Sequence, residues 1–328
     1  MNEKSPTSEM KTFPEKLKEV LFVCAVPVIA LTIYFIVWLP GVFASLKILQ
    51  AGSAPDDFTW VPSTEALIVR TIHTVIIMAL SFLAFFIYSL MKKQTYTHTL
   101  AQAGLRLRTR TDAINMGMVF STWFITFFAG NLIASLVNKA WSGFYEFPLT
   151  NTALQDPTIF LLSAIQAGPD EEIALVPLIV MSGVGAMQIV SRQAGKIILV
   201  CLISIAVIGR IAFHLYYGVG AIVAEGIWAA GLILAWFLWR NVWGAILAHS
   251  LNNALSALSL IPGWEFLGDT KIFIYLACVI FMLVNNKNFT RHWNNFTLAW
   301  KQDSAEELVD GAYLKTERGT EPQVTENI

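Results

Sequence analysis

Long runs of apolar residues, separated by short polar segments, are the feature of this sequence that most limits its fold. A membrane-crossing helix needs about 20 such residues, and in lipid each segment must satisfy its own backbone hydrogen bonds. The sequence therefore predicts an all-α, polytopic membrane helix bundle of about eight transmembrane helices. The candidate spans lie at 20–46, 66–91, 114–137, 158–190, 197–216, 219–239, 242–262 and 271–284.

The scarcity of charged residues supports this assignment. Only 14% of the 328 residues are charged and 55% are hydrophobic, whereas soluble domains carry roughly 25% charged residues. The net charge of −1 provides no basic field, so nucleic acid is not an expected partner. The three cysteines are far apart within apolar segments and are interpreted as small apolar side chains, at Cys24, Cys201 and Cys278.

The distribution of Lys and Arg predicts the orientation, because cytoplasmic loops are enriched in them. Basic residues gather before the first span and after the second, fourth, sixth and eighth, which predicts a multi-pass plasma-membrane protein with both termini cytoplasmic. We divide the chain into a cytoplasmic segment at 1–19, a membrane domain at 20–284 and a polar cytoplasmic tail at 285–328 that we expect to be disordered. The lipid bilayer is one predicted partner, and the oligomeric state stays open.

Three consecutive acids interrupt the fourth apolar run. Asp170, Glu171 and Glu172 follow Gly168-Pro169, where we expect the helix to break and a new one to begin. Asp170 would then be the N-cap, and the helix dipole would favour the acids. Capping does not account for all three acids, and intramembrane charges usually have a function.

Other polar residues in the predicted spans fall on shared helix faces. Arg210 and His214 are spaced i, i+4, as are His249 and Asn253. Glu225 is predicted to form a structural ion pair with Arg210. The remaining pair, Arg70 and His73, lies near the end of a span, where a structural role is favoured. A carboxylate in an apolar setting can act as a general base on water, and imidazoles can hold that water, bind a metal or stabilise an oxyanion together with an amide.

The order and spacing of these residues resemble the CPBP family, which comprises type II CAAX prenyl endopeptidases and bacteriocin-processing enzymes. Three stretches carry the resemblance: "PDEEIALV" with both glutamates, "RIAFH" ending at His214, and "WRNVWGAILAHSLNN" with His249 and Asn253. They lie in the family-like core at about 158–262. No H-E-x-x-H or G-x-S-x-G motif is present. The resemblance implies an intramembrane endopeptidase acting on a peptide or membrane-protein substrate.

Carried onto this sequence, the resemblance implies Glu171 as general base, with Glu172 as a supporting acid. It implies His214 and Asn253 as oxyanion stabilisers, and His249 as the residue that positions water. A divalent metal such as zinc is compatible with this set, with Glu171, His214 and His249 as its ligands.

The sequence departs from the family motifs at two positions. Val176 occupies the position of the family arginine, and Arg210 replaces a phenylalanine. Arg210 could supply the missing guanidinium by pairing with Glu172 or Glu225. The alternative is an inactive homologue that acts as a membrane interaction protein or a toxin-immunity protein.

A second alternative is a transporter, because intramembrane charges also line transport pathways.

The depths of the candidate residues do not agree fully. Counting helical rise from Lys196 places His214 roughly 27 Å into the membrane, whereas counting from Arg240 places His249 only about 13 Å in.

Overall fold

The computed structural model describes most of the chain, and every regular element in the described residues is helical. The described residues are 13–51, 64–140, 157–179, 181–183, 185, 192–215 and 220–301. The long N-terminal helices are α1 (Phe13–Ala51), α2 (Thr64–Met91) and α4 (Arg110–Ala140), with the short α3 (Tyr96–Gln102) between the last two. The remaining elements are α5 (Pro157–Ile173), η2 (Ala174–Leu178), α7 (Arg192–Phe213), α8 (Gly220–Trp239), α9 (Trp243–Leu258), α10 (Phe266–Val284) and α11 (Asn286–Lys301).

Five of these helices are long and apolar enough to cross a membrane, which confirms an all-α, membrane-embedded protein. The five segments are Thr64–Met91, Arg110–Val137, Gln193–Phe213, Ile222–Trp239 and Phe266–Val284. The other three predicted spans coincide with α1, with α5 and η2 together, and with α9. Each predicted span therefore contains helix within the part of the chain that the structure describes.

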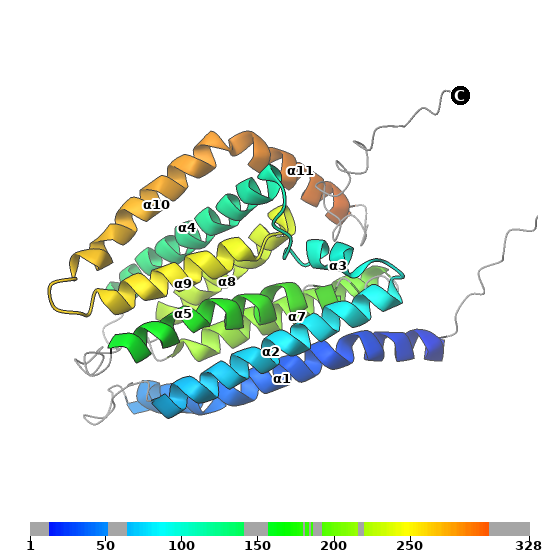
Figure 1. Cartoon of the computed structure of the whole chain (residues 1–328), viewed down its shortest axis with the longest axis horizontal. Helices are drawn as coiled ribbons and strands as arrows, with labels where there is room; N and C mark the ends of the chain where they lie inside the picture. The colour runs from blue at the N-terminus through cyan, green and yellow to red at the C-terminus, as the bar shows by residue number, and fades with distance from the viewer. Residues whose placement is uncertain are drawn as a thin grey trace, which may run out of the picture.

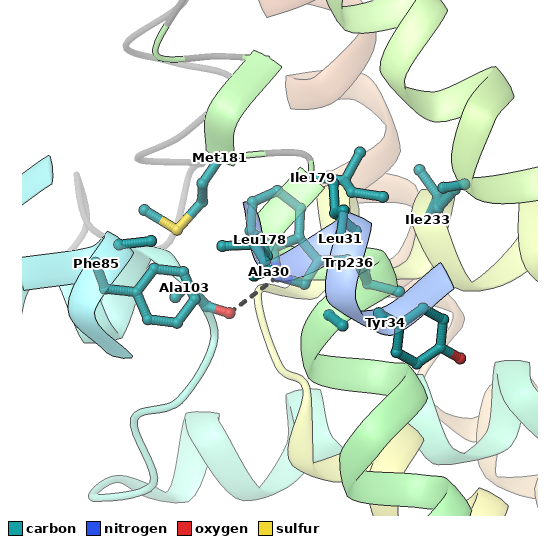
Figure 2. Packing of buried hydrophobic residues seen from close by; sticks show 14 of the residues in the cluster. Ala30, Leu31, Tyr34, Phe85, Ala103, Leu178, Ile179, Met181, Ile233 and Trp236 are labelled. Atoms are coloured by element: carbon teal, nitrogen blue, oxygen red, sulfur yellow. Dashed lines mark hydrogen bonds between the residues drawn. The ribbon is translucent and has the colours of Figure 1, made fainter. Parts of the chain in front are cut away.

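The long helices form a bundle with α1 and α2 along one side and α10 along the other (Figure 1). Between them, α4 packs extensively on α8 and α9, and α5 packs on α9. One apolar cluster joins α1, α2, η2, α7 and α8, and Figure 2 shows part of it around Trp236. The Trp236 indole N–H donates to the Ala103 carbonyl at 3.0 Å, which ties the segment after α3 to α8. The acids of α5 face the interior of this bundle.

The predicted break at Gly168-Pro169 does not occur, because α5 continues through Pro169 to Ile173. Proline has no N–H to donate to the carbonyl four residues earlier, here that of Ile165. The Ser250 hydroxyl on α9 donates to that carbonyl at 2.9 Å instead. Asp170 is therefore an interior helical residue and not an N-cap.

One π-helical turn, η2, follows the acids directly and contains Pro177. Pro177 has no N–H to donate in any helical register, and in an α-helix its ring would clash with the carbonyl four residues earlier. The π turn, which pairs residues five apart, lies where the proline interrupts the α-helical pattern. Single π turns occur frequently at functional sites. The turn is buried, and Val176 and Leu178 belong to the apolar cluster on α1, α7 and α8.

The predicted disordered tail must be corrected, because residues 286–301 form the helix α11. Phe289, Trp293, Phe296 and Trp300 are spaced four, three and four residues apart, which places their rings on one side of this helix. Phe296 contacts Phe237 on α8 at a ring distance of 5.5 Å. This aromatic contact holds α11 against α8. The overall polarity of the segment gave no indication of the helix. Residues 302–328 of the predicted tail, and most of the predicted segment 1–19, lie outside the described residues.

Candidate active site

An arginine and two glutamates form the centre of the candidate site. The Arg210 Nη2 atom on α7 lies 2.8 Å from Glu172 Oε1 and 3.1 Å from Glu171 Oε2, both on α5. Arg210 is 1% exposed, Glu171 5% and Glu172 0%. Sequence reasoning proposed Glu225 as the structural partner of Arg210 and Glu172 as an alternative. The geometry supports the alternative, since the guanidinium bridges both acids of α5.

His249 joins this group from α9. Its Nδ1 atom lies 2.9 Å from Glu172 Oε1, and its side chain is buried. The apparent difference in depth therefore does not separate it from the acids. The count began at Arg240 on the assumption that this residue marks the membrane surface. Arg240 is itself buried, with its guanidinium 3.9 Å from the centre of the Trp236 ring, so its charge does not by itself mark the membrane surface.

His214 lies one helical turn after Arg210, just past the end of α7. Its Nδ1 atom is 2.8 Å from the Arg210 carbonyl oxygen and 3.7 Å from Glu225 Oε2 on α8. A carbonyl only accepts hydrogen bonds, so Nδ1 carries the proton in this contact. Glu225 is buried and has an imidazole as its partner, in place of the predicted arginine.

Trp228 on α8 connects the three basic side chains. The Arg210 guanidinium carbon lies 4.0 Å from the centre of its ring, a favourable cation–π geometry. The His249 ring is 5.1 Å away and the His214 ring 6.2 Å away, both edge to face. Sequence reasoning missed this tryptophan. The available signal was its position three residues after Glu225, which places the two on one face of α8.

Asn253 makes a different contact from those of the acids and histidines. Its amide Nδ2 donates to the Ala164 carbonyl on α5 at 3.2 Å, about two helical turns before the glutamates. This hydrogen bond and that of Ser250 both connect α9 to α5. The geometry thus gives Asn253 a structural contact. Its role in stabilising an oxyanion stays a prediction.

The third acid, Asp170, points toward another helix. Its Oδ2 atom lies 3.7 Å from Arg70 Nε on α2. One turn after Arg70, the Thr74 hydroxyl donates to the Arg70 carbonyl at 2.9 Å. Successive helical residues are rotated by about 100°, so the three adjacent acids reach different partners. Asp170 therefore interacts with polar residues of α2. These residues lie next to the candidate site but make none of the contacts among Arg210, the two glutamates and the histidines.

The described side chains do not fit the predicted zinc site. Within the described ranges, no three His, Cys, Asp or Glu side chains are placed to hold a metal ion. The Glu172 oxygen nearest His249 is also engaged by the Arg210 guanidinium, and Glu171 Oε2 contacts the same guanidinium.

Comparisons with protein-family models, with curated proteins and with solved structures found no match.

Proposed function

We propose that this chain is an intramembrane endopeptidase resembling the CPBP family, in which Glu171 activates water to hydrolyse a peptide bond. One observation carries the proposal: two carboxylates, a guanidinium and an imidazole converge from three helices in the apolar interior of the bundle. Such charges are costly in a membrane and are retained where they act.

The contacts of the two glutamates favour Glu171 as the base. Glu172 is fully buried and accepts hydrogen bonds from both Arg210 and His249, so its lone pairs are largely used. Glu171 makes one contact to Arg210 and is slightly exposed. A general base must have a free oxygen within reach of the water it deprotonates. Glu172 instead positions the guanidinium and the imidazole.

The two histidines are held in the same tautomer. A carboxylate accepts the His249 Nδ1 proton and a carbonyl accepts that of His214. In this tautomer Nε2 is the acceptor atom of each ring, and once protonated it can donate to an oxyanion. Orientation by a second partner of this kind is what an acid–base histidine requires.

The charge balance of the site also supports proton transfer. Glu171, Glu172 and Glu225 contribute three potential negative charges, and Arg210 contributes the permanent positive one. A buried cluster of this kind is stabilised when protons are held among its carboxylates and imidazoles. The site can therefore bind and release a proton during hydrolysis.

The proposal includes eight membrane-crossing helices, a plasma-membrane location and cytoplasmic termini. Its substrates are peptides or membrane proteins, and nucleic acid is not among them.

Cleavage by purified protein in proteoliposomes tests the proposal. The assay compares wild type with Glu171→Gln and His249→Ala on prenylated and leader-type peptides, with Asp269→Asn on α10 as an acid control outside the site. We expect cleavage to fall about 10²–10⁴-fold in the two site variants and to stay unchanged in the control. Undiminished cleavage by Glu171→Gln would refute the assignment, and added chelator tests the zinc hypothesis separately.

A non-catalytic role is the second candidate, and one observation favours it. Arg210 engages Glu171 as well as Glu172, so both acids are held in a structural ion pair. An interaction or immunity protein would then keep its cellular phenotype when Glu171 is replaced by Gln.

A further inference from the structure

A second group of polar side chains lies on α1, α2 and α5, beside the candidate site. Arg70 faces Asp170 at 3.7 Å. One turn nearer the start of α5, the Gln166 amide donates to the Thr71 hydroxyl at 2.6 Å. These contacts connect two helices that both begin at the same end of the bundle (Figure 1).

Burial increases along this group. The Arg70 side chain is 15% exposed and begins roughly 9 Å along α2 from Thr64. Asp170 is 0% exposed and lies roughly 20 Å along α5 from Pro157. The polar side chains thus lead inward from the end of the bundle toward Glu171, the next residue in the chain.

Tyr34 on α1 joins the two polar groups. Its ring is completely buried, stacks on His73 at 5.8 Å and meets Phe213 edge to face at 5.4 Å. These contacts reach α2 three residues after Arg70 and α7 three residues after Arg210. Figure 2 shows its hydroxyl directed away from the apolar cluster.

Several polar atoms here are buried without a protein partner. Among the described residues, neither the Tyr34 hydroxyl nor Gln166 Oε1 has a hydrogen-bonding group within reach. A buried polar group left unpaired costs free energy, and in protein interiors such groups are usually satisfied by water. A run of them between the bundle end and a carboxylate is the arrangement that holds a chain of water molecules.

We propose that Thr71, Thr74, Gln166, Asp170 and Tyr34 line a hydrated path from the end of the bundle where α2 and α5 begin to Glu171. The path admits water and exchangeable protons to an otherwise apolar interior. Its use as the source of hydrolytic water rests on the proposed function, whereas its hydration does not.

Reaction of introduced cysteines with a charged, water-soluble methanethiosulfonate tests the path. Thr74→Cys and Gln166→Cys are compared with Val75→Cys, whose native side chain is 60% exposed on the lipid-facing side of α2 at the same depth. All are made in a chain with Cys24, Cys201 and Cys278 replaced by Ala and reconstituted in vesicles. Because the thiolate is the reactive form and needs water to ionise, we expect both path cysteines to react at least about tenfold faster than Val75→Cys.

Two results would overturn the proposal. Rates at Thr74→Cys and Gln166→Cys no higher than at Val75→Cys would show that the interior is dry. Equally fast reaction at all three positions would show that α2 is in water on both faces. The labelling is repeated with Glu171→Gln, which is expected to leave the rates unchanged. Fast labelling together with cleavage that survives Glu171→Gln would refute Glu171 as the general base and keep the path.

Discussion

The Ser250 hydroxyl on α9 donates a hydrogen bond of 2.9 Å to the Ile165 carbonyl on α5. That carbonyl is the one that Pro169 cannot use, so α9 supplies the hydrogen bond that the proline removes from α5. The same crossing brings Glu172 next to His249. The proline thus helps to join the two helices that carry the site.

The α5–α9 crossing depends on the small size of Gly168. A Cβ added there would lie 2.7 Å from the Ile246 carbonyl and would collide with the Ser250 hydroxyl. We expect Gly168→Ala to lower the free energy of unfolding by about 1–3 kcal/mol and Ser250→Ala by about 1 kcal/mol. Thermal unfolding in detergent measures both.

Two comparisons make this prediction specific. Gly226→Ala on α8 is the control, because its added methyl group would meet only one side-chain atom, at 3.6 Å. Removing the Ser250 hydroxyl relieves part of the collision at residue 168, so the double variant should lose less stability than the sum of the single variants. Equal stability of Gly168→Ala and Gly226→Ala would contradict the packing argument.

Arg210 neutralises two buried carboxylates, so its loss should be costly. We expect Arg210→Gln to destabilise the protein by about 3–5 kcal/mol, because breaking a buried ion pair leaves charge uncompensated. Arg210→Lys should be intermediate, since an ammonium lacks the planar fork of the guanidinium. Adding Glu172→Gln to Arg210→Gln should restore part of the stability. The unfolding midpoint in detergent provides the measurement, and no recovery in the double variant would count against charge compensation.

The docking of α11 should weaken at acid pH. Burial, with a further contribution from Arg291, lowers the pKa of His292 from 6.5 to about 4, partly opposed by a hydrogen bond to the Leu238 backbone. Folding therefore favours the neutral imidazole. Its contribution, about 3 kcal/mol, is complete above pH 6.5 and is lost as the pH falls toward 4. Limited proteolysis of α11 across this range should show increasing cleavage at low pH. The same pH profile in His292→Leu would rule out this histidine as the cause.

The proposed orientation predicts on which side two residues lie. Glu265, in the turn before α10, should face the outside, and Lys287 at the start of α11 should face the cytoplasm. In the cysteine-free chain, an impermeant thiol reagent should label Glu265→Cys in intact cells and Lys287→Cys only after permeabilisation. Labelling of both in intact cells would be incompatible with α10 as a crossing helix.

Sequence alone was sufficient to predict the fold class and the segments that form helices. Apolar runs of this length have no alternative to helix in a bilayer, because their backbone groups cannot bond to water. The acids, the histidines and Arg210 were recognisable for the same reason, since charge is rare in such segments. The i, i+4 spacing of His249 and Asn253 indicated a shared face but not a shared partner.

Tertiary structure decided which of these residues meet. Local rules favoured a break at Gly168-Pro169, but a hydroxyl on another helix satisfied the freed carbonyl and kept α5 continuous. Sequence distance could not rank Glu225 against Glu172 as the partner of Arg210, because that choice depends on how α7 packs against α5 and α8. Arg240 appeared to mark the membrane surface, although aromatic rings bury it. Trp228 brings the site's basic side chains together only because four helices converge around it, a relationship between segments that no local pattern encodes.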